Sequence, residues 1–407
     1  MEQKGVGPLE GVRVLDMSRI LAGPTCTQLL GDYGADIIKV ERPEFGDDTR
    51  AWGPPYVKDR NKKPTKESAY YLSSNRNKRS ISLDISTKEG RNTLKELLNH
   101  SDVLIENFKV GSLAKYGLDY QSLATEYPKL IYCSISGFGQ TGPNSHQPGY
   151  DLLAQAFGGI MSITGEPEGE PMKVGVGIAD VVCGLYSCTA ILAAMQHRNV
   201  TGSGQHIDIS LVDTQISWLI NAGTNYLISG KEPNRLGNQH PNIVPYQVFE
   251  SADGHVIVAV GNDSQFIRFC QVIGCADLAK NVRYATNANR VHNRIELLKI
   301  LSEEIKKLPK KFLVKEMDKH KIPGGSINKI SEVFNSEQVS ARNMKINMKD
   351  ERFHNGSIDL IGNPVKFSKT PVTYRHAPPK CGQHTDEIIS EFKNNIKKKN
   401  LTKRTVK

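Results

Sequence analysis

Residues 12–41 read VRVLDMSRILAGPTCTQLLGDYGADIIKVE, and this stretch decides the fold class. The apolar run at 12–17 predicts a β-strand, Pro24 begins a short helix that passes Leu30, and residues 35–41 predict a second strand. Parallel strands need a crossover connection, which is usually a helix. The stretch therefore predicts the strand–helix–strand unit of an α/β fold.

The same alternation continues outward from this unit. A helix with leucines on one face begins near Ser86, which stands at capping-box spacing from Glu89. A long apolar helix is predicted over about 178–197. Further strands are predicted at 80–84, 102–106, 130–135 and 205–209. Strands that alternate with helices predict a parallel sheet covered on both faces.

The middle of the chain has a different character. A loop rich in Gly, Pro, Asn and His at 234–246 precedes a buried strand at 256–260 and a charged helical segment at 290–321. A strand-and-turn pattern resumes at 327 and ends near Glu391. A smaller α+β domain inserted into a larger α/β domain explains this order. The predicted parts are 1–221 and 327–392 for the large domain, 222–326 for the insert, and 393–407 for a basic disordered tail.

Composition excludes several classes of function. The formal net charge is +10, but residues 393–407 supply seven basic groups and no acid, with no aromatic between them, so nucleic-acid binding is not predicted. We found no apolar run near the roughly 18 residues of a membrane span. The seven cysteines form no CxxC, and the histidines form no HxH or HExxH, so neither a disulfide framework nor a metal site is expected.

A nicotinamide-dinucleotide site is one alternative to consider, because Glu41 ends the second strand, where the acid that binds the ribose would stand. The first strand-to-helix turn reads SRILAGP at 18–24, however, and it lacks the G-x-G-x-x-G that lets the backbone approach a pyrophosphate. The sequence therefore disfavours NAD binding.

The most informative local stretch is VGVGIADVVCG at 174–184, which places Asp180 at the start of an apolar helix after two alternating glycines. Asp is a favoured N-cap, so a capping role is one interpretation. A carboxylate nucleophile is the other, because a helix N-terminus favours the charged form and glycines let a substrate approach. A second glycine pair, at 158–159, suits a narrow thioester site. The residues alone leave both interpretations open.

Basic residues recur near the ends of the predicted strands. In a doubly wound sheet ligands bind outside the carboxyl ends of the strands, so cations there can meet phosphates. Each is individually typical of a surface charge, but as a set they suggest a phosphorylated ligand. The residues are Arg42, Lys78, Arg79, Lys109 and Lys115.

Ordered motifs across residues 9–390 resemble the class III CoA-transferases, the family that includes formyl-CoA transferase and the carnitine CoA-transferases. The motifs are LEGVRVLD (9–16), AGP (22–24), GADIIKVER (34–42), GDDTR (46–50), NKRSI (77–81), ENF (106–108), SGFGQTGP (136–143), TGSGQ (201–205) and GQHTD (382–386). The resemblance implies a Rossmann-like large domain built from both chain ends, an inserted smaller domain, and two chains interlocked as a homodimer.

The resemblance also assigns site residues. It places the catalytic aspartate at Asp180, which on its ordinary pKa is expected to be ionised at pH 7. Some family members carry a basic residue where this chain has Ser136, so a phosphate contact there is in doubt. The residues expected to line the CoA groove are Leu21, Ala22, Arg42, Leu83, Asp84, Ile85, Ser86, Asn107, Phe108, Lys109, Lys115, Ser136, Gly137, Phe138 and Gly139.

Within the family, the stretches 49–55, 131–135, 243–247 and 290–294 resemble the members that use dicarboxylate acceptors. This implies succinyl-CoA as donor, glutarate or 3-hydroxymethylglutarate as acceptor, CoA thioesters as substrates with no permanently bound cofactor, and a mitochondrial location, otherwise a cytoplasmic one. Candidate groups for the far carboxylate of the acceptor are Arg50 and the loop near Arg235 and His240.

Four alternatives remain beside this interpretation. Another class III CoA-transferase, specific for formate and oxalate, carnitine or itaconate, would use the same catalytic aspartate. An α-methylacyl-CoA racemase would need a Gly-His-Asp motif, where this chain has Tyr150 between Gly149 and Asp151. A non-catalytic CoA-binding protein would share the groove without exchange activity, and a nucleic-acid-binding protein would depend on the basic tail.

Overall fold

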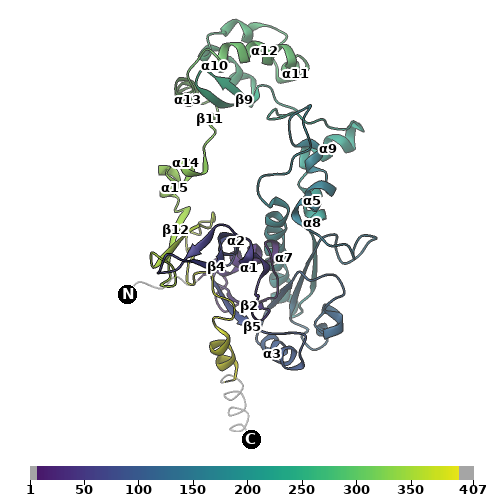
Figure 1. Cartoon of the computed structure of the whole chain (residues 1–407). Coiled ribbons are helices and arrows are strands. Elements are labelled where there is room, and N and C mark those ends of the chain that lie inside the picture. The colour runs from purple at the N-terminus through teal and green to yellow at the C-terminus, as the bar shows by residue number, and fades with distance from the viewer. Residues whose placement is uncertain (1–6, 394–407) are drawn as a thin grey trace. The chain divides into compact units, whose positions relative to one another are not determined.

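The computed structural model describes residues 7–393 (Figure 1). Their contacts group residues up to 160, 173–224 and those from 339 onward into one compact unit, and residues 161–172 and 225–338 into another. The predicted domain boundaries at 221/222 and 326/327 stay predictions, for which limited proteolysis is the test. The predicted basic tail falls almost wholly outside the described residues.

A six-stranded sheet forms the centre of the first unit. Its strand order is β5-β2-β1-β6-β7-β8, and every neighbouring pair is parallel. The strands are β1 (Arg13–Asp16), β2 (Asp36–Glu41), β5 (Lys78–Ser82), β6 (Val103–Glu106), β7 (Ile131–Ser136) and β8 (His206–Ser210). The prediction of an α/β fold with a parallel sheet is therefore confirmed, and each of the six strands lies within two residues of its predicted position.

Alternation along the strands divides the core between the two faces of this sheet. Val14 faces a cluster with residues of the helices α1 (Ala22–Asp32) and α7 (Ile178–Thr201). Its neighbour Leu15 faces a cluster with leucines of α3 (Lys88–Leu98). Ile105 and Leu104 are divided in the same way. Because both faces are covered, central strands such as β6, which reads VLIE, are nearly continuous apolar runs, whereas the edge strands β5 (KRSIS) and β8 (HIDIS) are more polar.

The three predicted helices of this unit, which are α1, α3 and α7, lie close to their predicted positions, with one wrong cap. Thr87, not Ser86, caps α3, since its hydroxyl accepts from the Gly90 amide at 3.0 Å, while Ser86 bonds to Asp84 instead. The helices lying wholly in this unit are α1 (Ala22–Asp32), η1 (Asp48–Ala51), α2 (Ala69–Ser73), α3 (Lys88–Leu98), η2 (Ala114–Tyr116), α4 (Tyr120–Ala124), α5 (Asp151–Phe157), α7 (Ile178–Thr201) and α8 (Leu211–Ser217).

The long helix α7 corrects one expectation. By length and composition it qualifies as a membrane span, because its most apolar window has a mean hydropathy of 1.8. The expectation that no segment is long and apolar enough to cross a membrane is therefore wrong by the test of helix length and hydropathy. Half of the window is buried inside the protein, which is also the property of a core helix. Cys183 and Cys188 are buried residues of this helix and belong to the core cluster.

The return segment after residue 339 is only partly the strand-and-turn pattern that was predicted. It contains an antiparallel pair, but residues 385–393 are helical, and Ile388 and Phe392 pack in the same core cluster as α3. The prediction of strand and turn from 327 to Glu391 is therefore wrong at both ends, since Ile330–Phe334 and Glu337–Ala341 are also helical. The strands outside the main sheet in this unit are β3 (Tyr56–Lys58), β4 (Pro64–Ser68), β12 (Lys345–Lys349) and β13 (Ser357–Ile361).

The second unit has its own core. An antiparallel sheet in the order β11-β10-β9 packs with three helices, where one charged helical segment was predicted, around buried residues such as Phe249 and Leu301. Its elements are β9 (Tyr246–Ser251), β10 (Gly254–Ala259), α10 (Asp263–Val272), η3 (Ala276–Lys280), α11 (Asn287–His292), α12 (Arg294–Ile305), α13 (Lys310–Lys319), β11 (Gly324–Ser326) and α14 (Ile330–Phe334). The short helices α6 (Ile160–Ile163), α9 (Ile220–Ser229) and α15 (Glu337–Ala341) cross the boundaries between the units.

The strand order locates the expected binding crevice. From β1 the chain moves to β2 and β5 on one side, and β6 is followed by β7 and β8 on the other. The order therefore reverses between β1 and β6. Ligands of open α/β sheets bind outside the carboxyl ends of the strands at such a switch point, because the loops there diverge.

Candidate active site

Two cavities lie at the carboxyl ends of the strands in the first unit. One, of about 550 Å³, is lined from the ends of β1, β2 and β5, and we name it the nucleotide cavity. The other, of about 470 Å³, is lined from β1, β6 and β7 and contains Asp180, and we name it the aspartate cavity. Arg19 and Phe108 line both, so the two cavities adjoin at the switch point.

The loops after β1 and β6 are joined by one side chain. Asn107 accepts the Arg19 amide at 2.9 Å through Oδ1 and donates to the Arg19 carbonyl at 2.7 Å through Nδ2. Both polar atoms of the amide are used, so this side chain orients the Arg19 loop rather than presenting a free group. Arg19 also ion-pairs with Asp48 at 2.6 Å.

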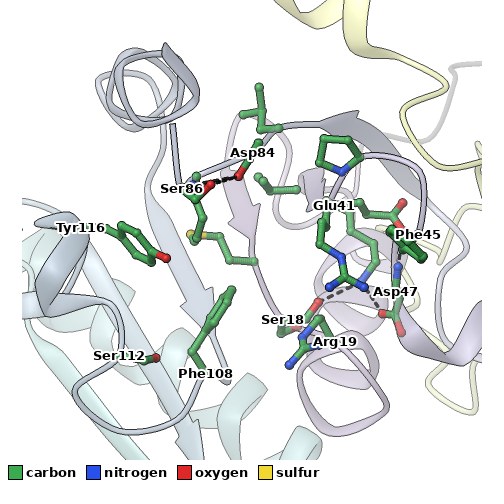
Figure 2. A pocket seen from close by; sticks show the side chains of 18 of the residues that line it. Ser18, Arg19, Glu41, Phe45, Asp47, Asp84, Ser86, Phe108, Ser112 and Tyr116 are labelled. Atoms are coloured by element: carbon green, nitrogen blue, oxygen red, sulfur yellow. Dashed lines mark hydrogen bonds and ion pairs between the residues drawn. The ribbon is translucent and has the colours of Figure 1, made fainter. Parts of the chain in front are cut away.

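Cations stacked on aromatic rings line the nucleotide cavity. The Arg42 guanidinium lies 4.7 Å from the Phe45 ring centre, and the Lys115 ammonium lies 4.7 Å from that of Tyr116. In the view of Figure 2, Phe108 and Tyr116 stand across the cavity from Phe45. Phe45 is 67% exposed, so much of its ring is accessible from the cavity that it lines. Aromatic faces and fixed cations are the groups that bind a purine base and phosphates.

A buried network of charges supports this cavity from below. Lys39 donates to Asp47 at 2.8 Å and to the Ser18 carbonyl at 2.9 Å, and this pair of charges is almost inaccessible. The Lys39 ammonium holds the pKa of Asp47 at about 2. Glu41 accepts the Asp47 amide at 2.8 Å. A Cβ on Gly46 would lie 2.7 Å from the Glu41 carboxylate, and its φ is +65°, so this turn requires glycine.

This network overturns several predicted roles. Arg50 is 6% exposed and bonds to Glu41, Glu67 and Tyr71, so it is not placed to bind an acceptor carboxylate. The Glu41 carboxylate accepts hydrogen bonds from the Asp47 amide, Arg50 and Ser80, so it is not free to bind a ribose, in agreement with the disfavoured NAD site. Lys78 is buried, and its ammonium bonds to Asp16, Pro24 and Asn75. Arg79 pairs with Asp36, Glu387 and Glu391, so neither of these two cations is placed to bind a phosphate.

Close helix packing brings Asp180 to the aspartate cavity. Asp180 stands in the first turn of α7, and Ala22, the first residue of α1, lines the same cavity. A Cβ on Gly184 would lie 2.6 Å from the Ala22 carbonyl, so glycine is needed where the two helices meet. Gly137 and Gly149 meet as closely, since a Cβ on Gly149 would lie 2.1 Å from the Gly137 Cα. The loops that carry Gly137 and Gly149 therefore lie against each other, and both glycines line the cavity that contains Asp180.

Asp180 is 8% exposed, and its environment alters its acidity. Burial, with a smaller contribution from the negative charge of Asp151, raises the pKa of Asp180 to about 7. The expectation that Asp180 is ionised at pH 7 used the ordinary pKa of a hydrated carboxyl, and burial shifts this carboxyl toward its protonated form. Perturbed carboxyls in a cleft are typical of catalytic sites.

Most of the residues assigned to the CoA groove line one of the two cavities. Leu21 lines neither cavity and stands at the N-cap position of α1, where its side chain makes no capping hydrogen bond. Gly139 donates its amide to the Ser136 hydroxyl at 2.9 Å, so Ser136 stabilises its own turn. Phe138 packs edge-on against Phe157. The nucleotide cavity contains Arg42, Leu83, Asp84, Ile85, Ser86, Phe108 and Lys115, and the aspartate cavity contains Ala22, Asn107, Phe108, Lys109, Ser136 and Gly137.

Several lining residues were not predicted as site residues. Phe45 and Tyr116 stand beside the assigned cations, and an aromatic next to a basic residue after a strand was the available signal. Trp52 and Tyr150 line the aspartate cavity, but both are distant in sequence from Asp180, so no spacing pattern identifies them. Within residues 7–393 no cluster of three His, Cys, Asp or Glu residues is arranged to hold a metal ion.

A model of the family described as CoA-transferase family III matches residues 9–385. The chain belongs to this family, as the motifs indicated, and it is an enzyme that transfers CoA.

Individual relatives agree with this assignment. The chain is 49% identical over 386 residues to the succinate–glutarate CoA-transferase of Agrobacterium fabrum, covering 95% of this chain and 96% of that protein. It is 43% identical over 391 residues to the human succinyl-CoA:glutarate CoA-transferase, covering 96% and 87%. The crystal structure of a CAIB/BAIF family protein from Brucella suis has 46% identity and a TM-score of 0.83, covering 96% of this chain and 100% of that one.

Proposed function

We propose that this enzyme moves CoA from succinyl-CoA to a dicarboxylate acceptor, glutarate or 3-hydroxymethylglutarate, with Asp180 as the covalent nucleophile. The observation that carries the mechanism is the buried Asp180 carboxyl in a cavity that adjoins a second one suited to a nucleotide. The choice of substrates rests on the two glutarate-using relatives.

The two cavities suggest the course of CoA. Its adenine and phosphates would lie among Arg42, Phe45 and Lys115, and its pantetheine arm would cross Arg19 and Phe108. The thioester would then reach Asp180. Binding of the distant nucleotide would hold the reacting carbonyl close to the carboxylate, so that binding energy lowers the barrier of the chemical step.

The chemistry keeps the acyl group activated throughout. The Asp180 carboxylate attacks the succinyl-CoA carbonyl, the C–S bond breaks, and an aspartyl–succinyl anhydride and CoA thiolate result. The thiolate attacks the aspartyl carbonyl, which releases succinate and leaves an aspartyl-CoA thioester. The acceptor carboxylate attacks that thioester, and thiolate returns to the acceptor carbonyl. Asp180 is regenerated, and no ATP is consumed.

Two features of the aspartate cavity fit this scheme. A raised pKa makes the Asp180 carboxylate a stronger nucleophile once it is ionised, as general Brønsted behaviour requires. Tyr150 stands where a racemase would need histidine, which removes the second base of a two-base proton exchange. Transfer is therefore favoured over racemisation. Arg235, another residue predicted to bind the far acceptor carboxylate, belongs to the second unit, where its guanidinium donates to the carbonyls of Glu166, Pro167 and Gly169.

We propose that the enzyme is an interlocked homodimer. Helices α5, α7 and α8 carry large apolar side chains that stay partly exposed, and a second copy of the chain is the occupant that the family resemblance implies. These side chains are Leu152, Leu153, Phe157, Leu185, Tyr186, Leu192 and Ile216. Light scattering during gel filtration should give twice the chain mass of 45.1 kDa, whereas a monomer would contradict the proposal.

A mitochondrial location is proposed on the family resemblance, and a fluorescent fusion that fails to colocalise with a mitochondrial marker would contradict it.

A mass-spectrometric exchange assay tests the function. Purified protein is incubated without ATP with succinyl-CoA and a panel of glutarate, 3-hydroxymethylglutarate, oxalate, malonate, itaconate and carnitine. Glutaryl-CoA or 3-hydroxymethylglutaryl-CoA should form, and Asp180→Ala should abolish both. Oxalyl-CoA or carnitinyl-CoA alone would contradict the substrates but keep the mechanism, and full exchange by Asp180→Ala would contradict the covalent scheme.

A further inference from the structure

A second carboxylate lies against the backbone that carries Asp180. Asp151, the first residue of α5, accepts the Ala179 amide at 2.8 Å and the Asp180 amide at 3.3 Å, both through Oδ1. None of the roles assigned above involves this residue. It reaches the first turn of α7 from a different helix, across 28 residues of sequence.

The start of α7 needs such a partner. The first amides of a helix have no acceptor within the helix, and the N-cap here is Gly177, which has no side chain to supply one. A Cβ at Gly177 would lie 3.6 Å from the Asp151 carboxyl and 3.1 Å from the Leu21 side chain. The Asp151 carboxylate, which comes from a different helix, therefore supplies the cap that Gly177 lacks.

The other oxygen of Asp151 is held as firmly. Gln155 lies one turn further along α5 and donates to Asp151 Oδ2 at 2.7 Å. Its Oε1 accepts the Val174 amide at 2.9 Å, and its side chain is fully buried. Asp151 and Gln155 thus form a relay that joins the glycine loop at 174–177 to the first turn of α7.

Asp151 also contributes charge at the site. When the Asp180 carboxylate attacks a thioester, its negative charge moves to the thioester carbonyl oxygen and then to the departing CoA thiolate, so the repulsion between the two carboxylates is relieved. A fixed neighbouring charge therefore disfavours the free carboxylate relative to the acylated forms of Asp180. The titratable groups that interact electrostatically with Asp180 are Asp151 from α5, Tyr70 from α2 and Cys183 from α7. The other charged residues that line the cavity are Arg19, Asp48 and Lys109.

We propose that Asp151 is a positioning residue for CoA transfer: it fixes the first turn of α7 and, through Gln155, the glycine loop, and it holds a negative charge beside the Asp180 carboxyl. This inference rests on the proposed covalent function of Asp180, and it adds the group that orients and activates the nucleophile.

A pair of variants separates the two parts of this role. Asp151→Asn removes the charge and turns an NH₂ toward the Gln155 NH₂, so the relay is broken. The double variant Asp151→Asn with Gln155→Glu restores it, because the new carboxylate accepts both the side-chain NH₂ introduced at position 151 and the Val174 N–H. The negative charge then lies one helical turn further along α5, at position 155 instead of 151.

The readouts are exchange kinetics with succinyl-CoA and glutarate as a function of pH. Asp151→Asn should lower kcat by about 10-fold or more and leave KM for succinyl-CoA within about two-fold, because only orientation and charge change. The apparent pKa of the acid limb of kcat/KM should fall below the wild-type value. The double variant should recover most of the kcat but keep the lowered acid limb.

The matched control is Glu89→Gln, which removes an exposed acid from the first turn of α3, away from both cavities, and should leave the kinetics unchanged. Wild-type kcat and an unchanged pH profile in Asp151→Asn would overturn the proposal. So would an equal loss in both Asp151 variants with an unchanged acid limb, since that is the result of a merely structural residue. If Asp180→Ala is active the covalent function fails, whereas an inactive Asp180→Ala with an unaffected Asp151→Asn overturns only the positioning role.

Discussion

Replacing the buried nucleophile should stabilise the protein, and more so at high pH. A raised carboxyl pKa means that the native state holds its proton more tightly than the unfolded state does. Stability is therefore unaffected below the ordinary pKa of 3.8, falls as the pH rises toward about 7, and is constant above it. Asp180→Asn keeps the shape of the side chain and removes this cost.

The magnitude follows from the shift. Each pH unit between 3.8 and about 7 costs about 1.4 kcal/mol, so the full cost is about 4 kcal/mol above pH 7. At pH 5 only the first part applies, about 2 kcal/mol. The free energy of unfolding of Asp180→Asn, relative to wild type, should thus increase by about 2 to 3 kcal/mol between pH 5 and pH 8.5.

Urea unfolding of both proteins in parallel, at one protein concentration and followed by circular dichroism, measures this difference. The comparison cancels pH effects that both proteins share, and Glu89→Gln serves as the control for loss of an exposed acid. A difference between Asp180→Asn and wild type that does not change with pH would refute the reasoning, because Asp180 would then have the same pKa folded and unfolded.

Three other variants probe the groups around the two cavities. Phe45→Ala should raise KM for succinyl-CoA about 5-fold with kcat unchanged, because loss of a stacking face removes about 1 kcal/mol or more, and an unchanged KM would show that the ring does not contact the nucleotide. Lys39→Met should destabilise the fold by about 3 to 5 kcal/mol in urea unfolding, since it leaves the buried Asp47 charge unpaired, and a neutral effect would contradict the network. Asn107→Ala should lower kcat/KM several-fold by releasing the Arg19 loop, with thermal stability nearly unchanged, and wild-type kinetics would show that the loop is held by other contacts.

The parallel sheet was predictable because its strands are buried on both faces. Strands such as Val103–Glu106 therefore carry apolar residues continuously, and the helices between them repeat the pattern. The short strands at Tyr56–Lys58 and Pro64–Ser68 escaped prediction, since they are polar and half exposed. The helix at 385–393 was missed, although Ile388 and Phe392 stand four residues apart, which is the spacing of one helix face.

The roles of charged residues were the least predictable part. A basic residue at a strand end looks the same in sequence whether it faces a cavity, as Arg42 does, or is buried against acids, as Lys78 is. The partners of Lys78 and Arg50 come from other segments of the chain, so no local pattern shows them.

The same limit applies to Asp180. Its position was indicated by the glycine-rich turn and by the family motifs. Its altered acidity depends on burial and on the distant Asp151, which only the fold brings together.

Isotope transfer to Asp180 tests the central claim most directly. The enzyme is cycled with succinyl-CoA and glutarate labelled with ¹⁸O in both carboxylates, and the peptide that contains Asp180 is then examined by mass spectrometry. In the covalent scheme the acceptor leaves one of its oxygens on the aspartate when CoA returns to the acceptor carbonyl, so the first turnover should place one heavy oxygen on Asp180. Turnover to glutaryl-CoA with an unlabelled Asp180 would contradict the account, because the acyl group would then have bypassed the aspartate.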